Sequence, residues 1–177
     1  MRHALAAFAA TLAVAVPAWA QDDAQSLQAQ VMTADGQEAG TVTFTQAENG
    51  VLVEANLQNV HEGEHGFHIH ETGACEPDFQ AAGGHYSPAG NEHGFDTPEG
   101  HHVGDLPNIH VAADGTAMVD HFAPRLTLAA DDDDQEPFTL ADADGSAIMV
   151  HAQADDYQSA DSAGDRIACG VIASSGG

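Results

Sequence analysis

The sequence predicts an all-β protein, an eight-stranded antiparallel β-barrel or sandwich that carries two long functional loops. Three observations lead to this fold class. Apolar and polar residues alternate in short segments, turn-forming residues separate these segments, and none has the long 3.6-residue apolar period of an amphipathic helix. The alternating segments cover residues 27–32, 41–46, 51–58, 66–71, 108–112, 117–122, 147–152 and 167–172.

Turn signals and two unusual stretches separate the predicted strands. Asn49-Gly50 predicts a two-residue hairpin turn, and Asp114-Gly115 predicts a turn between two later segments. Residues 72–107 are rich in Gly and Pro, whereas residues 153–165 are polar and acidic. A connection as long as the first is uncommon in a compact domain unless it has a function. We therefore expect both stretches to be functional loops on a rigid β scaffold.

The N-terminal residues 1–20 predict a secretory signal peptide. Residues 1–3 (MRH) give a positive start, an apolar run follows over residues 4–16, and the small residues of a cleavage site end at Ala20. The run is too short to span a bilayer comfortably, and no later run is longer. Residues 21–177 then form a single domain, which we expect in the periplasm or outside the cell.

The chain is strongly acidic. It contains 3 Lys and Arg against 28 Asp and Glu, which gives a formal net charge of −25. Such a field repels nucleic acid and anionic lipid, so we expect neither nucleic acid nor a membrane as a partner. We interpret Asp131–Asp134 as a solvated acidic surface rather than a specific cation site. As a hypothesis, this acidity suits a salty habitat, where dissolved ions screen the self-repulsion.

The cysteine count favours a disulfide. Cys75 and Cys169 are the 2 cysteines of the chain, and an even count in an exported protein favours pairing. A pair of buried free thiols is the alternative.

The 12 histidines are distributed unevenly and predict metal binding. His68 and His70 are two residues apart in an apolar segment, so both project from the same face of a strand. His151 ends another such segment near the C-terminus. Imidazole is a good ligand for copper and zinc, and several imidazoles on one sheet face can form a redox-capable copper site. Ordinary histidines on a polar strand face are the alternative.

The long loop contributes a second candidate set. His85, His93 and His102 are followed by Asp105, and three nitrogens with one carboxylate oxygen complete a closed tetrahedral shell. Zinc takes this form in structural sites, although thiolate ligands are commoner there. The alternative is a histidine-rich surface loop that binds metal loosely.

Five blocks of the sequence closely resemble the copper/zinc superoxide dismutases of the exported bacterial type. The blocks are HGFHIHE at 65–71, GGHYSP at 83–88, HVGDL at 102–106, MVH at 149–151 and GDRIACG at 164–170. The likeness extends from about residue 28 to residue 172. It implies a Greek-key β-barrel, copper and zinc as cofactors, and dismutation of superoxide to dioxygen and hydrogen peroxide, as protection against extracytoplasmic superoxide.

The resemblance also implies the site residues. It assigns copper to His68, His70, His85 and His151. It assigns zinc to His85, His93, His102 and Asp105. His85 would bridge the two ions and carry a proton during catalysis. The family's intrasubunit disulfide corresponds to Cys75 and Cys169, and dimers are common in the family, which makes a homodimer a candidate without giving an interface.

Two more residues take roles from the resemblance. Asp155 matches an outer-shell carboxylate that accepts hydrogen bonds from a copper ligand and a zinc ligand, here His68 and His93. Arg166 would hold superoxide beside copper as a permanently charged donor. Family members commonly carry lysines in the loop before this arginine, whereas residues 153–165 contain four aspartates and no cation. As a hypothesis, added salt should therefore speed the reaction by screening repulsion.

Other functions would use the same histidines. A non-catalytic periplasmic copper/zinc binding protein is the main alternative, but it would not need Arg166 or Asp155. A copper-only relative would lack part of the zinc shell, and a hydrolytic zinc enzyme would need an open zinc position. Five histidines stay unassigned, and His65 among them is expected to hydrogen-bond backbone rather than metal: His61, His65, His101, His110 and His121.

Overall fold

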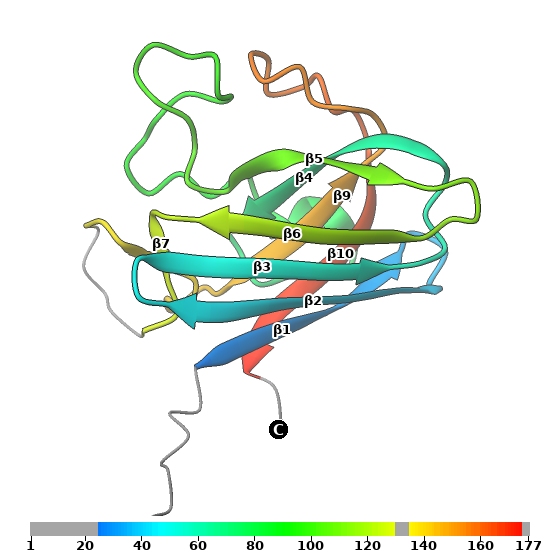
Figure 1. Cartoon of the computed structure of the whole chain (residues 1–177), viewed down its shortest axis with the longest axis horizontal. Helices are drawn as coiled ribbons and strands as arrows, with labels where there is room; N and C mark the ends of the chain where they lie inside the picture. The colour runs from blue at the N-terminus through cyan, green and yellow to red at the C-terminus, as the bar shows by residue number, and fades with distance from the viewer. Residues whose placement is uncertain (1–24, 130–134, 175–177) are drawn as a thin grey trace, which may run out of the picture.

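The computed structural model describes residues 25–129 and 135–174, and it confirms the all-β expectation (Figure 1). In chain order, the strands of these residues are β1 (Ser26–Thr33), β2 (Glu38–Ala47), β3 (Gly50–Leu57), β4 (Gly63–His70), β5 (Asp105–Val111), β6 (Ala117–Ala123), β7 (Leu126–Thr127), β8 (Phe138–Thr139), β9 (Ser146–His151) and β10 (Arg166–Ser174). One short 3₁₀ helix, η1 (Phe79–Ala82), lies in the long loop after β4.

Eight of the strands form one antiparallel sheet that curls into a nearly closed barrel. The strand order is β5-β4-β9-β10-β1-β2-β3-β6, and every pairing in it is antiparallel. The two edge strands, β5 and β6, follow each other in the chain and lie side by side in Figure 1. The connections from β3 to β4 and from β6 to β9 pass over neighbouring strands, which gives the Greek-key arrangement.

The barrel interior is the hydrophobic core. Alternate residues of β3, from Val51 through Val53 to Leu57, point into it, while Glu54 between them faces solvent. The side-chain period of two in a strand places one apolar set on the inner face. In β4, Phe67 joins the same core. Because Phe67 points into the core, the histidine next to it in β4 projects from the opposite face of the strand.

The hairpin between β2 and β3 differs by one residue from the expected turn at Asn49-Gly50. Glu48 and Asn49 form the turn, and Gly50 already pairs with Ala47 in the ladder. Gly50 has a φ of +149°, and a Cβ at this position would lie 2.6 Å from the carbonyl oxygen of Ala123. Close approach to the end of β6 therefore explains the glycine.

Both long loops rise from the same side of the barrel, near the ends of β4 and β9 (Figure 1). A small two-stranded parallel sheet, β7 with β8, was not expected from the sequence. The expected signal peptide at residues 1–20 and the acidic run Asp131–Asp134 lie outside the described residues. No helix within residues 25–129 and 135–174 has the length and apolar character needed to cross a membrane.

Candidate metal centre

The first histidine set lies on the outer face of β4 and β9, beneath the long loops. Ile69 packs into the barrel core, so its neighbours His68 and His70 project from the opposite face. His151 ends β9, which pairs directly with β4. An isolated bridge between His70 and His85 brings the long loop to the same place. Ligand atoms of four residues then lie within 4.8 Å of one another: His68, His70, His85 and His151.

Backbone carbonyls orient two of these rings. His70 Nδ1 donates to the carbonyl of Gly83 at 3.1 Å, and His151 Nδ1 donates to the carbonyl of Gly164 at 3.1 Å. The remaining nitrogens of the two rings, both Nε2, face each other at 3.4 Å. Since each ring is held through Nδ1, its Nε2 lone pair is the one available to a metal ion.

The second set surrounds one oxygen of Asp105. Asp105 Oδ1 lies 2.9 Å from His85 Nδ1, 3.0 Å from His93 Nδ1 and 3.3 Å from His102 Nδ1. A tetrahedral zinc ion with bonds of about 2.0 Å would separate its ligand atoms by about 3.3 Å. The four side chains therefore have the spacing of a closed zinc shell. His85 belongs to this set and to the first.

Two nitrogens without hydrogen bonds support metal binding. His68 Nδ1 and His102 Nδ1 are buried and make no hydrogen bond with the described residues. A buried polar atom without a partner is costly, so such atoms usually serve a ligand or an ion. One of the two belongs to each cluster, and each faces the other ligand atoms of its set. The donor sets fit copper and zinc, since imidazole suits both metals and the three-nitrogen, one-carboxylate shell suits zinc.

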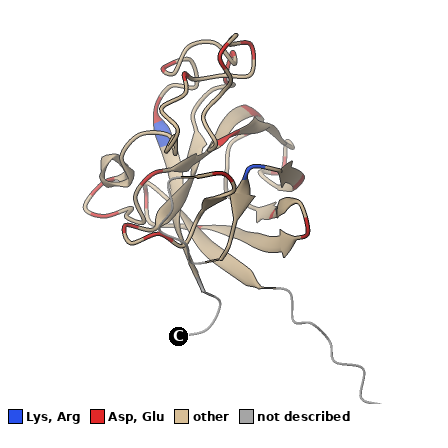
Figure 2. Ribbon diagram, turned by 90° about the vertical axis from the view of Figure 1, so that its left-hand side faces the viewer, with Lys and Arg blue, Asp and Glu red and all other residues tan. Residues whose placement is uncertain are grey.

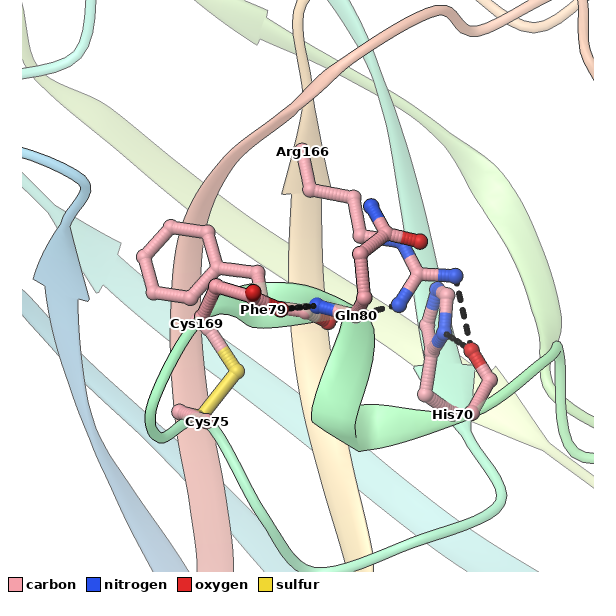
Figure 3. Close-up of a disulfide and its surroundings, with 8 residues drawn as sticks. His70, Cys75, Phe79, Gln80, Arg166 and Cys169 are labelled. Carbon is pink, nitrogen blue, oxygen red and sulfur yellow. Dashed lines mark hydrogen bonds between the residues drawn. A yellow bond between two sulfur atoms is a disulfide. The ribbon is translucent and has the colours of Figure 1, made fainter.

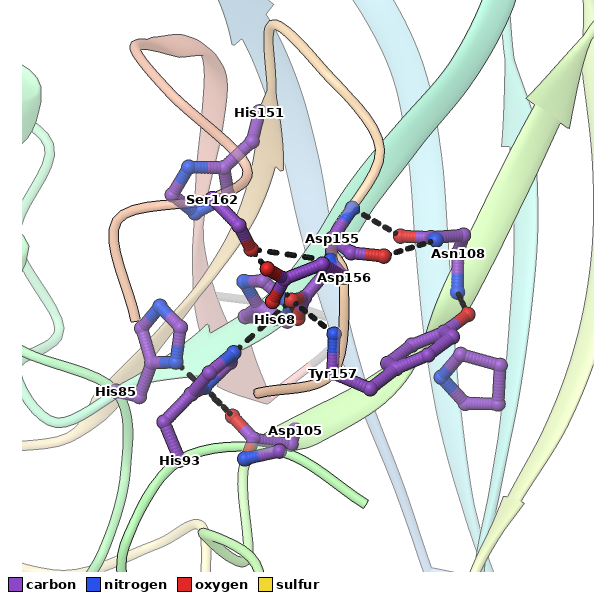
Figure 4. Close-up of polar contacts among 12 residues, drawn as sticks. His68, His85, His93, Asp105, Asn108, His151, Asp155, Asp156, Tyr157 and Ser162 are labelled. Carbon is purple, nitrogen blue, oxygen red and sulfur yellow. Dashed lines mark hydrogen bonds and ion pairs between the residues drawn. The ribbon is translucent and has the colours of Figure 1, made fainter. Parts of the chain in front are cut away.

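Asp155 links the two clusters from behind (Figure 4). His68 Nε2 donates to Asp155 Oδ2 at 2.8 Å, and His93 Nε2 donates to Asp155 Oδ1 at 3.0 Å. The backbone amide of Tyr157 and the hydroxyl of Ser162 also donate to Oδ1, each at 2.9 Å. A carboxylate in this position fixes the tautomer and the orientation of a ligating imidazole. The nitrogen of each ring that points away from Asp155 is Nδ1, and in His93 this atom lies 3.0 Å from Asp105 Oδ1.

Asn108 on β5 holds Asp155 in turn, and sequence reasoning missed it. Asn108 Nδ2 donates to the carbonyl of Asp155 at 2.9 Å, and the amide of Asp155 donates to Asn108 Oδ1 at 2.8 Å (Figure 4). The two bonds clamp the peptide of the acidic loop to the strand that begins at Asp105. The sequence shows only that Asn108 begins a predicted strand close to Asp105. This position does not reveal the contact with residue 155.

Arg166 is positioned by the long loop rather than by an acid. Its Nη1 donates to the carbonyl of Phe79 at 2.6 Å, and its Nη2 donates to the carbonyl of Gly83 at 2.7 Å (Figure 3). Gly83 is also the carbonyl that orients His70, so one oxygen ties the guanidinium to a ligand of the first cluster. The expected disulfide between Cys75 and Cys169 is confirmed, and it joins the segment before η1 to β10.

Comparison with known proteins identifies the family. The family model described as Copper/zinc superoxide dismutase (SODC) matches residues 38–172. The chain belongs to this family. A Caulobacter vibrioides superoxide dismutase [Cu-Zn] is 44% identical over 151 residues, covering 83% of this chain and 85% of that protein. Copper and zinc are accordingly the cofactors, and the dismutase reaction is the activity.

Solved structures in the dismutase family share the fold. The Cu/Zn superoxide dismutase from Brucella abortus has a TM-score of 0.67 and 31% identity, covering 84% of this chain and 99% of that chain. A SOD-like protein from Bacillus subtilis has a TM-score of 0.73 and 37% identity, covering 81% of this chain and 96% of that chain. The sequence resemblance and the Greek-key expectation are both confirmed.

Burial keeps three imidazoles of the first histidine set neutral: His70, His85 and His151. Burial, together with the adjacent His85, lowers the pKa of His70 to about 2. Burial and the nearby His68 lower the pKa of His151 to about 3. Burial also lowers the pKa of His85, to about 4, although Asp105 opposes the shift. At neutral pH these rings therefore present lone pairs rather than protons to a cation.

The second set, around Asp105, contains the charged groups. Burial alone would raise the pKa of Asp105, but the adjacent His102 ring and hydrogen bonds from His85 and His93 outweigh it and hold that pKa far below the usual range. Burial disfavours a charged His93, yet its hydrogen bonds to Asp105 and Asp155 raise its pKa to about 9. A metal that takes His93 Nδ1 must displace this proton, so binding should release it.

A cavity of about 450 Å³ lies beside the first histidine set. Its lining includes His85, His151 and Arg166, together with the acidic pair Asp161 and Asp165. A larger cavity of about 1000 Å³ follows β1 and β10 beside the disulfide and contains no histidine. The smaller cavity is therefore the one at which the metal chemistry can occur.

Some of the histidines to which the dismutase resemblance assigns no metal make other contacts in the described structure. Both ring nitrogens of His65 face carbonyls, with Nδ1 2.7 Å from the oxygen of His151 and Nε2 2.9 Å from that of His61. This agrees with the backbone role expected for His65. His101 Nδ1 donates to the carbonyl of His102 at 2.6 Å, and His121 Nε2 to that of Pro107 at 3.1 Å. None of these rings belongs to either cluster.

Proposed function

We propose that the two clusters divide the dismutase work as a copper site and a zinc site that share His85. The copper site comprises His68, His70, His85 and His151. The zinc site comprises His85, His93, His102 and Asp105. The observation that carries the proposal is that one imidazole, His85, offers a ligand atom to both sets. Copper, when bound, supplies one-electron transfer between successive superoxide anions, and zinc supplies fixed charge.

Arg166 is proposed to bind the superoxide anion in the cavity beside the copper cluster. Its guanidinium is permanently protonated, and two carbonyls fix its direction. It forms no ion pair with any described carboxylate, so its charge is available to an anion. Preorganised donors of this kind stabilise a developing or bound anion without having to reorganise.

His85 is proposed to carry a proton. Its Nδ1 is fixed against Asp105, which leaves Nε2 as the nitrogen on the side of the copper cluster. Nε2 can therefore hold a proton and deliver it to the reduced substrate. Overall, two superoxide anions and two protons give one dioxygen and one hydrogen peroxide, so proton delivery is needed for each turnover.

The cellular location is proposed from the N-terminal sequence. Residues 1–20 are proposed to direct export, so that the single domain of residues 21–177 protects against superoxide in the periplasm or outside the cell. Mass spectrometry of protein recovered from the periplasm should find a chain that begins near Gln21. A homodimer stays a prediction, which light scattering on the purified protein would decide.

The role of Arg166 is tested by Arg166→Ala with Arg125→Ala as a matched control. Arg125 is the other arginine of the described chain, and its Nε is paired with Glu136 at 3.0 Å. We expect Arg166→Ala to keep both metals and to lose on the order of 100-fold in superoxide decay rate. Arg125→Ala should keep both metals and the rate. Equal rates in the two variants would overturn the assignment.

A further inference from the structure

Two carboxylates line the cavity beside the proposed copper site. Asp161 and Asp165 both line it, together with His85, His151 and Arg166. Both aspartates are exposed, and both lie in the loop that leads from β9 to β10. An anion in this cavity therefore lies near these two negative charges.

Neither charge is neutralised by a neighbour. Within the described residues, the carboxylates of Asp161 and Asp165 make no hydrogen bond and no ion pair. The whole sequence contains no lysine, and Arg125 is engaged by Glu136. Figure 2 shows acidic residues on the loops around the molecule and few basic ones. Arg166 is thus the single fixed side-chain cation at the cavity, and carbonyls hold it.

We propose that Asp161 and Asp165 are specificity-determining residues that discriminate against anions at the mouth of the copper cavity. The proposal rests on the proposed function, because it concerns access to that same site. The two carboxylates repel superoxide as it approaches Arg166. The product hydrogen peroxide is uncharged, so they do not repel it as it leaves. Dissolved salt screens the pair over about 10 Å at 0.1 M and about 3 Å at 1 M, so salt regulates anion access.

The local origin of the effect can be separated from the overall acidity. Asp161→Asn with Asp165→Asn removes two charges at the mouth without breaking a described side-chain contact. Glu54→Gln with Asp120→Asn removes two charges that lie opposite each other on β3 and β6, away from the cavity. Both double variants change the net charge equally. A difference between them is therefore an effect of position.

The experiment uses protein loaded with copper and zinc, with azide as the probe anion. The azide dissociation constant is read from the copper absorption spectrum, and superoxide decay is measured in parallel, from low salt to 1 M NaCl. At low salt, removing the charges of Asp161 and Asp165 should tighten azide binding and speed superoxide decay, each about fivefold. Two unit charges at an assumed distance of about 8 Å in water would have an effect of this size. The gain should disappear at 1 M NaCl. Removing the charges of Glu54 and Asp120 should change the azide affinity and the superoxide decay rate by less than about 1.5-fold.

Two results would overturn the proposal. One is an equal gain from both double variants, which would assign the effect to net charge alone. The other is no gain, or a loss, in azide affinity for the mouth variant while its melting temperature matches that of the unmodified protein. Should azide bind as expected but no variant consume superoxide, the proposed function fails and the discrimination against anions stands.

Discussion

Asn108 holds the backbone of Asp155, and Asp155 holds one imidazole from each metal cluster. Asn108→Ala removes both bonds of the clamp and leaves the ligands themselves untouched. We expect zinc affinity to fall about tenfold, because partners behind the ligands typically contribute 10- to 100-fold. Competition with a coloured chelator measures the change.

His110→Ala is the control for that variant, since His110 lies two residues further along β5 and is exposed. It should leave zinc affinity unchanged. If the two variants bind zinc equally well, Asn108 does not act through Asp155.

Individual ligands could be predicted from the sequence because their spacing and neighbouring motifs are local. His68 and His70 share a strand face through the period of two, and the structure places both on that face. Asn108 could not be predicted, since its partner is 47 residues away and the contact depends on how the acidic loop folds back. The same holds for Gly83, whose contribution is a backbone carbonyl and carries no side-chain signal.

The eight long strands were all predicted, with ends that differ by up to three residues. The expected segment 108–112 corresponds to β5, which begins earlier, at Asp105, because Asp105 already pairs with His68 of β4. Three short elements were not predicted: η1, β7 and β8. These elements are too short to show a periodicity, and contacts made elsewhere in the fold determine them.

The disulfide links two elements that carry the site, the segment before η1 and strand β10. Replacing Cys75 and Cys169 by Ser together should reduce the free energy of unfolding of the metal-free protein by about 4 to 5 kcal/mol. The physical reason is the separation of 94 residues, which lets the bond restrict the unfolded chain strongly. Urea unfolding of the two proteins under non-reducing conditions measures this loss.

The same double variant should also weaken azide binding to the copper-loaded protein. The carbonyls of Phe79 and Gly83 that direct Arg166 lie in and just after η1, which the bond anchors. A loss below about 1 kcal/mol in the unfolding experiment would contradict the proposed contribution of the long closed loop.

At the scale of the whole molecule, the formal net charge of −25 opposes compaction. We expect the melting temperature to rise by several degrees between low salt and about 2 M NaCl, because ions screen the repulsion among carboxylates. Calorimetry at neutral pH measures the rise. The control is the same titration at acidic pH, where protonated carboxylates no longer repel and the gain should shrink. A melting temperature that is insensitive to salt at neutral pH would contradict the idea that acidity limits stability.

We propose that one barrel face and two loops build a copper site and a zinc site that together dismutate superoxide. Metal analysis and superoxide decay on one purified sample test it most directly. We predict one copper and one zinc per chain, with superoxide consumption that stops when a chelator removes the metals and returns when both are restored. A sample that holds both metals in that ratio and consumes no superoxide would contradict the account.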